Sequence, residues 1–242
     1  MSGAAVPPTL TVAQTDALAD RMLDHCRERG VLPPAPQGLW QGYHRLRSRL
    51  YETVTIPDTH LTPLAARLLY GIAVARRPRR LAVLGCYAGN LLSWVAGPGF
   101  APQACYPGIR AVGLDVDAAA VALAERNLRS AGYAPGAVAV CADAYAADDF
   151  TAQGPWDLVL IDVDEPGARK AGYHRVLERW APHLAPGAVV VAHDVRHPAF
   201  ADDLAGYAGH ARGQGAVATT TLPVDVCGLE VSRWPGPSGS PA

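Results

Sequence analysis

Short apolar runs alternate with segments of helical spacing from residue 81 onward. The apolar runs are continuous, as in strands of a sheet that is covered on both faces. They lie at residues 81–85, 111–115, 137–141, 157–162 and 187–193. Helical spacing of apolar residues recurs at residues 89–96, 117–131, 172–181 and 198–211. This alternation predicts an α/β fold with a doubly wound, mostly parallel sheet.

The end of the chain departs from that alternation. Residues 216–222 and 228–233 read as two strands with no helix between them, so we expect an antiparallel hairpin at the sheet edge and seven strands in all. Residues 97–108 are rich in Gly and Pro and predict a loop. Residues 235–242 are small and polar and predict a flexible tail.

Three helices are predicted before the first strand. The first runs from Val12 to Arg29, and Thr11 with Gln14 has the spacing of a capping box. The third begins at Thr62-Pro63, with proline in its first turn. The second carries one apolar stripe, formed by Leu39, Tyr43, Leu46 and Leu50. We expect these helices, within residues 1–75, to cover one edge of the sheet as a lid.

The stretch Leu-Ala-Val-Leu-Gly-Cys-Tyr-Ala-Gly-Asn at residues 81–90 predicts a strand, a glycine turn and a helix start. Gly85 can take a positive φ, Gly89 has no Cβ to block a ligand, and Tyr87 lies between them. The next strand ends in Asp115, whose carboxylate can accept both hydroxyls of a ribose. The pattern indicates a cofactor of the adenosine type.

Further motifs follow in a fixed order. They are Leu-Thr-Pro-Leu-Ala-Ala-Arg-Leu-Leu, the glycine turn, Gly-Leu-Asp-Val-Asp, Ala-Glu-Arg-Asn-Leu-Arg-Ser-Ala-Gly, Cys-Ala-Asp-Ala, Trp-Asp-Leu-Val-Leu-Ile-Asp, Leu-Ala-Pro-Gly-Ala-Val-Val-Val-Ala-His-Asp-Val and Gly-Leu-Glu-Val-Ser-Arg. With them, residues 59–233 resemble class I S-adenosylmethionine-dependent methyltransferases, nearest to small O-methyltransferases of the catechol and caffeoyl-CoA type.

The resemblance implies a Rossmann-like methyltransferase-type domain at residues 76–234 that binds S-adenosylmethionine. By the resemblance, Gly85 and Gly89 border the methionine part of the cofactor. Asp115 binds the ribose hydroxyls, and Asp143 binds the adenine amino group. The implied reaction is methyl transfer to a hydroxyl of a small molecule.

The sequence departs from this family at the cofactor acid and at the metal site. The acid that normally precedes the first glycine by two residues is Val83. Metal-dependent members bind a divalent cation with an acid after strand 4 and an Asp-Asn pair after strand 5. Asp162 and Asp194 are present, but Val195 stands at the Asn position, and valine cannot ligate a hard cation. A divalent metal is therefore doubtful, and we assign no metal ligand.

The catalytic lysine of the family has also changed. Its position, three residues after the strand-4 acid, is occupied by Glu165. Lys170 is displaced along the sequence, and we expect its replacement by alanine to matter little. We expect Glu165 to make the site mouth more acidic and to raise the pKa of at least one carboxyl there.

Asp162 and Asp194 should lie side by side, because they follow neighbouring parallel strands. Two such charges about 4 Å apart repel by roughly 4 kcal/mol, so a cation, a shared proton or a charged neighbour must offset them. One interpretation is a weak metal site, and another is a proton-shuttling site of Asp162, Asp164, His193 and Asp194. A third is that one acid caps a helix and the other is solvated. We take Asp162, His193 and Asp194 as the candidate catalytic residues.

Aromatic and polar residues of the N-terminal part are candidates for an acceptor pocket, although an aromatic stripe is more often core. They are Trp40, Tyr43, His44, Arg47 and His60.

Composition narrows the class of protein. The 242 residues suffice for a full core, and the net charge of −1 gives no reason to expect nucleic acid or a membrane surface as partner. Five scattered cysteines without metal spacing are typical of reduced cytosolic thiols. No signal peptide or long apolar run is evident, so we expect a cytoplasmic protein.

The leading functional hypothesis is a methyltransferase of small-molecule biosynthesis. An alternative is an enzyme of the same fold that catalyses a displacement or cyclisation without methyl transfer. A third is a non-catalytic partner subunit, because fold alone does not fix function. A small-molecule substrate is expected in the first two cases, and a homodimer or partner subunit is possible.

Overall fold

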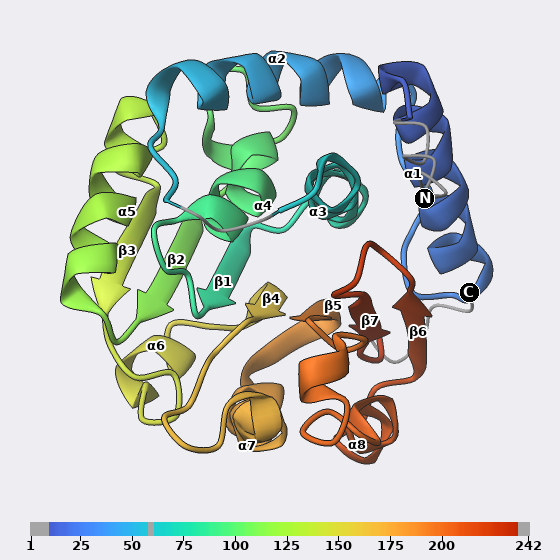
Figure 1. Cartoon of the computed structure of the whole chain (residues 1–242), viewed down its shortest axis with the longest axis vertical. Helices are drawn as coiled ribbons and strands as arrows, with labels where there is room; N and C mark the ends of the chain where they lie inside the picture. Colours follow the sequence, from blue (N-terminus) through green and yellow to red (C-terminus); the bar gives the residue numbers. More distant parts are fainter. Residues whose placement is uncertain (1–9, 58–60, 237–242) are drawn as a thin grey trace, which may run out of the picture.

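A seven-stranded sheet runs through the part of the chain that the computed structural model describes, residues 10–57 and 61–236. Its strand order is β3-β2-β1-β4-β5-β7-β6. The strands are β1 (Arg80–Leu84), β2 (Arg110–Asp115), β3 (Ala137–Cys141), β4 (Trp156–Ile161), β5 (Leu184–His193), β6 (Ala218–Leu222) and β7 (Leu229–Arg233). Helices cover both faces (Figure 1).

Strands β1 to β5 pair in parallel, and β7 is antiparallel to both β5 and β6. The doubly wound sheet and its antiparallel edge hairpin are thus confirmed. Strands β1 and β4 are neighbours. From β1 the chain continues to β2 and β3 on one side, and from β4 it continues to β5 on the other side, so the strand order reverses between β1 and β4. In open α/β sheets, ligands bind at the carboxyl ends of the strands beside this switch point.

One face of the sheet carries α3 (Pro63–Arg76), α4 (Asn90–Phe100) and α5 (Ala118–Ser130), and α1 (Val12–Glu28) lies on the same side near β6 (Figure 1). The other face carries α6 (Asp148–Thr151), α7 (Tyr173–Trp180) and α8 (Tyr207–Gly213). Each face has its own apolar core. Short 3-10 turns η1 (Lys170–Gly172), η2 (Ala181–His183) and η3 (Pro198–Phe200) complete the fold.

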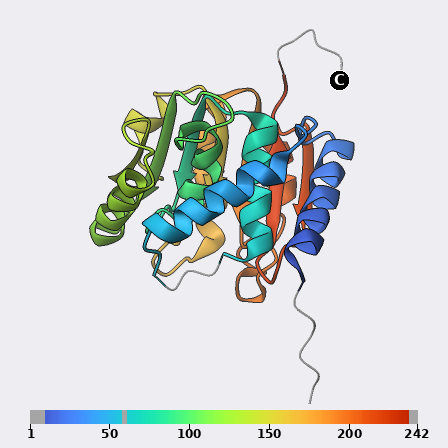
Figure 2. The same cartoon turned by 90° about the horizontal axis from the view of Figure 1, so that it is seen from above.

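Helix α3 does not lie over one edge of the sheet, where we expected the N-terminal helices to form a lid. Every residue of α3 from Ala65 to Ala75 is buried, and α3 packs on the middle of the sheet. Most residues of α3 are apolar, and a helix with apolar side chains on every side is stable only when it is buried. Helix α2 (Leu39–Thr53) lies outside it and crosses α3 and α4 (Figure 2). The N-terminal helices and the sheet share one apolar core, so a domain boundary near residue 75 would cut through that core.

Helix α1 lies at the β6 end of the sheet. Its capping box forms as predicted between Thr11 and Gln14. His25 Nε2 is 3.0 Å from the Thr220 hydroxyl of β6, which ties the helix to the edge strand.

Two predicted boundaries were wrong. Helix α4 continues through Gly97 to Phe100, where we expected a loop. A Cβ on Gly97 would lie 2.4 Å from Leu46 Cδ2, so the glycine lets this part of α4 pack closely against α2. The helix predicted at residues 198–211 is instead η3, a series of turns and α8. Gly206 has a φ of 76°, which interrupts a continuous helix. Among the described residues, we find no helix with the length and apolar character needed to span a bilayer.

Candidate functional site

A cavity of about 610 Å³ opens at the carboxyl ends of β1 to β5. Each of these strands contributes a lining residue just beyond its end or at it. They are Gly85, Asp115, Asp143, Asp162 and Asp194. The cavity therefore lies where the topology predicts a ligand site.

The glycine turn is tied to the end of β2. The backbone N–H of Tyr87 donates to Asp115 Oδ2 at 2.7 Å, and the N–H of Asp117 donates to Asp115 Oδ1 at 3.0 Å. Tyr87 has a φ of 43° and is partly exposed at the cavity. Asp143, after β3, accepts from the backbone N–H of Tyr145 at 2.8 Å. The side chains of Asp115 and Asp143 are thus fixed at the cavity wall.

Both glycines are required by protein packing. Gly85 has a φ of +82°, and a Cβ there would lie 2.2 Å from the carbonyl oxygen of Asp162. Gly89 has a φ of +86°, and its Cβ would lie 3.2 Å from Ala124 Cβ on α5. A Cβ on Gly89 would thus point at α5, which differs from our expectation that it would obstruct a ligand.

Val83 lies in the interior of β1 with none of its surface exposed. It packs in the core that contains α3 and α4. Val83 therefore offers a cofactor no hydrogen-bonding group, at the position where the sequence resemblance leads us to expect an acid.

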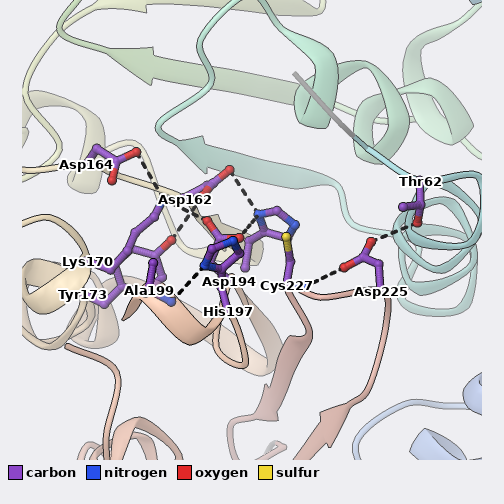
Figure 3. A network of polar contacts seen from close by, with 11 residues as sticks. Thr62, Asp162, Asp164, Lys170, Tyr173, Asp194, His197, Ala199, Asp225 and Cys227 are labelled. Atoms are coloured by element: carbon purple, nitrogen blue, oxygen red, sulfur yellow. Dashed lines mark hydrogen bonds and ion pairs between the residues drawn. The ribbon is translucent and has the colours of Figure 1, made fainter. Parts of the chain in front are cut away.

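Asp162 and Asp194 meet as the sequence predicts. Strands β4 and β5 are parallel neighbours with Ile161 beside Ala192, so both acids emerge at one mouth. Between them lies the ammonium of Lys170 (Figure 3). Lys170 Nζ is 2.7 Å from Asp162 Oδ1, 3.2 Å from Asp194 Oδ2 and 3.3 Å from Asp164 Oδ2. The offsetting charge is a lysine to which we had assigned no role.

A tight loop brings Lys170 to this position. Glu165 N–H donates to the Arg169 carbonyl at 2.9 Å, and Arg169 N–H donates to the Glu165 carbonyl at 2.7 Å. This pairing closes the loop over Pro166-Gly167, so Lys170 returns to the end of β4. In the sequence we looked for a lysine three residues after Asp162 and therefore did not place Lys170 at the site. The Pro-Gly pair is the sequence signal that could have indicated the reversal.

Glu165 does not add free negative charge to the mouth as we expected. Its carboxylate pairs with the guanidinium of Arg175 on α7. The glutamate at the lysine position of the related enzymes is thus already neutralised by a neighbouring cation.

The charged groups at the mouth shift one another's pKa values toward the ionised forms. Burial alone would raise the pKa of Asp162, but His193 and Lys170 more than reverse this effect and hold it below its usual range. Burial would lower the pKa of Lys170, whereas Asp162, Asp194 and Asp164 raise it above its usual value. The expectation of a carboxyl with a raised pKa is therefore wrong for Asp162. Lys170 remains charged and is unsuited to act as a base.

His193 lies at the end of β5 and is 8% exposed. Its Nδ1 is 3.4 Å from Asp162 Oδ2 and 3.5 Å from Asp194 Oδ1. Burial disfavours the imidazolium, but the adjacent Asp162 outweighs that effect and raises the pKa of His193 well above its usual value. The raised pKa favours the protonated, cationic form of the ring.

The His193 ring is expected to stay protonated through pH 7 and to titrate well above the ordinary histidine pKa of about 6.5. Because the folded-state pKa is raised, the associated stabilisation is complete below about pH 6.5 and is lost as the pH rises through the folded value. NMR titration of the His193 ring carbons measures this directly. Asp162→Asn should lower that pKa. Titration of the wild-type ring at or below its ordinary pKa would contradict the assignment.

The donor set does not fit a hard divalent cation. Both acids that would serve as ligands contact Lys170, and the half-buried Val195 side chain has no ligand atom. His193, Asp194 and Cys227 do place one ligand atom each within 4.8 Å of one another. His193 lowers the pKa of the Cys227 thiol, but burial and Asp194 raise it to a net value above the usual one. A metal bound there would therefore have to displace the thiol proton.

A second cavity, of about 390 Å³, lies between α2, α3 and α4. Tyr43 lines it and stacks on Trp94, with ring centroids 5.3 Å apart. Leu61 and Asn90 line both this cavity and a small space that reaches Asp162 and His193. Tyr43 is thus the candidate acceptor residue that the structure places at a cavity near the mouth.

The other acceptor candidates have different surroundings. Trp40 and His44 each contact an aspartate of α1 at 2.9 Å, and the Arg47 guanidinium lies 4.6 Å from the ring centre of Tyr51. These contacts fix α2 against α1 and along its own surface. His60 lies outside the described residues.

Residues 83–195 match the family described as a methyltransferase domain, a segment that runs from β1 past Asp194. No curated protein matches the chain.

Solved structures match nearly the whole chain. Cofactor-bound Rv0187 from MTB has a TM-score of 0.64 at 20% identity and covers 95% of this chain and 100% of its own. The O-methyltransferase TomG of Streptomyces achromogenes, involved in tomaymycin synthesis and solved with SAM, has a TM-score of 0.59 at 19% identity over 94% and 100% of the two chains. The O-methyltransferase of Bacillus cereus, solved with SAH, has a TM-score of 0.59 at 16% identity over 90% and 99%.

At these identities the solved structures establish the fold, while the family match identifies the segment that carries the cavity. The chain has the Rossmann-like α/β fold of these solved structures, and its residues 83–195 match the family described as a methyltransferase domain.

Proposed function

We propose that this protein transfers the methyl group of S-adenosylmethionine to a hydroxyl of a small molecule. The observation that carries the proposal is the cavity at the ends of β1 to β5, whose glycine turn is held by Asp115. The methyltransferase-domain match and the SAM- and SAH-bound structures of similar fold support it. We place the reaction in small-molecule biosynthesis, in the cytoplasm.

The residues around the cavity suit an adenosine cofactor. Each carboxylate oxygen of Asp115 accepts one backbone N–H and keeps a lone pair for a ribose hydroxyl. Asp143 lies at the end of the next strand, where its free oxygen can accept from an adenine amino group. Gly85 and Tyr87 line the same cavity just beyond the end of β1. When bound, S-adenosylmethionine supplies an electrophilic methyl group on a sulfonium.

The chain's own residues have two tasks in such a reaction. They must orient the acceptor oxygen for in-line displacement, and they must accept its proton. Asp162, His193 and Asp194 meet at the mouth, and the two carboxylates are the groups suited to the second task. The raised pKa of His193 favours its imidazolium form, which stabilises negative charge instead of accepting a proton.

Cofactor binding tests the proposal by calorimetric titration of S-adenosylhomocysteine. Asp115→Ala should weaken binding by about 1–3 kcal/mol, or roughly 5- to 150-fold, because the ribose hydroxyls lose their acceptor. Asp115→Asn retains an acceptor for the Tyr87 N–H and separates turn disruption from ribose recognition. Asp24→Asn, which changes an exposed carboxylate on α1, is the matched control and should bind normally.

The possible outcomes distinguish the three hypotheses. Tight binding, together with label transfer from methyl-labelled cofactor to a hydroxyl compound, supports the methyltransferase. Binding without transfer to any acceptor favours a displacement or cyclisation on the same fold. No detectable binding at millimolar ligand contradicts the proposal and favours a partner subunit.

A further inference from the structure

We propose that Lys170 is the resident cation of this site, a positioning residue whose ammonium holds Asp162, Asp164 and Asp194 together in place of a metal ion. The inference concerns the chain's own charges. It therefore stands apart from the identity of the acceptor and from cofactor binding.

The contacts of the ammonium match its capacity. A lysine ammonium has three N–H donors and no acceptor. Lys170 Nζ has three carboxylate neighbours, at 2.7, 3.2 and 3.3 Å. Its side chain is 3% exposed, whereas Asp162 and Asp194 are 19% and 13% exposed. The lysine is thus more buried than these two acids, and all of them line the same cavity.

The surroundings of Lys170 hold it in this position. Its Nζ lies 5.5 Å from the ring centres of both Tyr173 and Phe200. The Tyr173 hydroxyl donates to Asp162 Oδ1 at 3.2 Å, the same oxygen that accepts from Lys170. The closed loop from Glu165 to Arg169 fixes the backbone on one side, and η1 leads directly into α7 on the other.

The charge balance explains why a further cation is unnecessary. Three carboxylates face two cations, Lys170 and the protonated His193, which leaves one net negative charge at the mouth. An incoming divalent ion would have to displace a tethered ammonium. Without Lys170, His193 would be the one cation left beside the three acids, and their excess of negatively charged oxygen ligands is the kind of site that Mg²⁺ and Ca²⁺ favour.

A gain of cation binding in variants of the purified full chain tests the role of Lys170. Lys170→Met keeps an unbranched apolar stem and removes the charge, whereas Lys170→Arg keeps the charge. Titration with MgCl₂, CaCl₂ and MnCl₂ should show no saturable binding to the wild type or to Lys170→Arg. Lys170→Met should bind at least about tenfold more tightly than the wild type, and its melting temperature should rise with added cation.

Two further measurements separate positioning from general support of the fold. Adding Asp194→Asn to Lys170→Met should abolish the gained cation binding, since one ligand oxygen loses its charge. In Lys170→Met the pKa of the His193 ring should rise further, because a neighbouring positive charge is lost. If Lys170→Met does not fold, Lys170→Gln, which keeps a polar amide at the same place, takes its role in both measurements.

The proposal is overturned if the wild-type protein binds Mg²⁺ saturably below millimolar concentration. It is also overturned if Lys170→Met and Lys170→Gln fold but show no saturable binding of divalent cations. None of these titrations contains S-adenosylhomocysteine. Failure of cofactor binding would therefore leave their result unchanged, and the two proposals fail separately.

Discussion

Gly85→Ala should lower the free energy of unfolding by about 2–5 kcal/mol, the sum of left-handed backbone strain and overpacking. The added Cβ would lie 2.2 Å from the Asp162 carbonyl oxygen and 2.5 Å from its carbonyl carbon. Both atoms belong to backbone at the end of β4, so relief requires moving the strand end that carries Asp162. Urea unfolding followed by circular dichroism measures the loss.

Gly187→Ala is the matched control. Gly187 has a φ of +71°, and no atom lies within 4 Å of the position of an added Cβ. It should cost only the left-handed strain, about 1–2 kcal/mol. Equal losses for the two variants would show that the contact between the glycine turn and β4 is looser than the structure indicates.

Asp194→Asn should lower the rate of methyl transfer by about 100-fold or more if this carboxylate accepts the acceptor's proton. Asp194 has a φ of 63°, a conformation that asparagine tolerates well, so the shape of the turn is kept. Lys170 retains Asp162 and Asp164, and stability should change little. Transfer from labelled S-adenosylmethionine to an identified acceptor gives the rate.

Asp24→Asn removes an exposed carboxylate on α1 and serves as the control for charge alone. The affinity for S-adenosylhomocysteine should be unchanged in both variants, because the expected loss lies in proton transfer. A normal rate in Asp194→Asn would mean that another group, such as Asp162, takes the proton.

The sequence by itself determined the strands, the mostly parallel sheet that they form and the meeting of Asp162 with Asp194. Continuous apolar runs specify buried strands, because the two faces of each strand must both leave water. Once β4 and β5 are neighbours, parallel pairing alone brings the residues after them to one edge. The glycine turn and Asp115 are similarly local, since a turn and a strand end need only a few adjacent residues.

Only the tertiary structure decided what lies between those acids. Lys170 reaches them because the loop from Glu165 to Arg169 closes on itself, and that contact is invisible to a count of residues. The place of α3 in the middle of the sheet, and the contact of Gly89 with α5, likewise depend on which surfaces meet. Periodicity records which side chains avoid water, whereas the partner that each side chain or charge finds is set by the packing of distant segments.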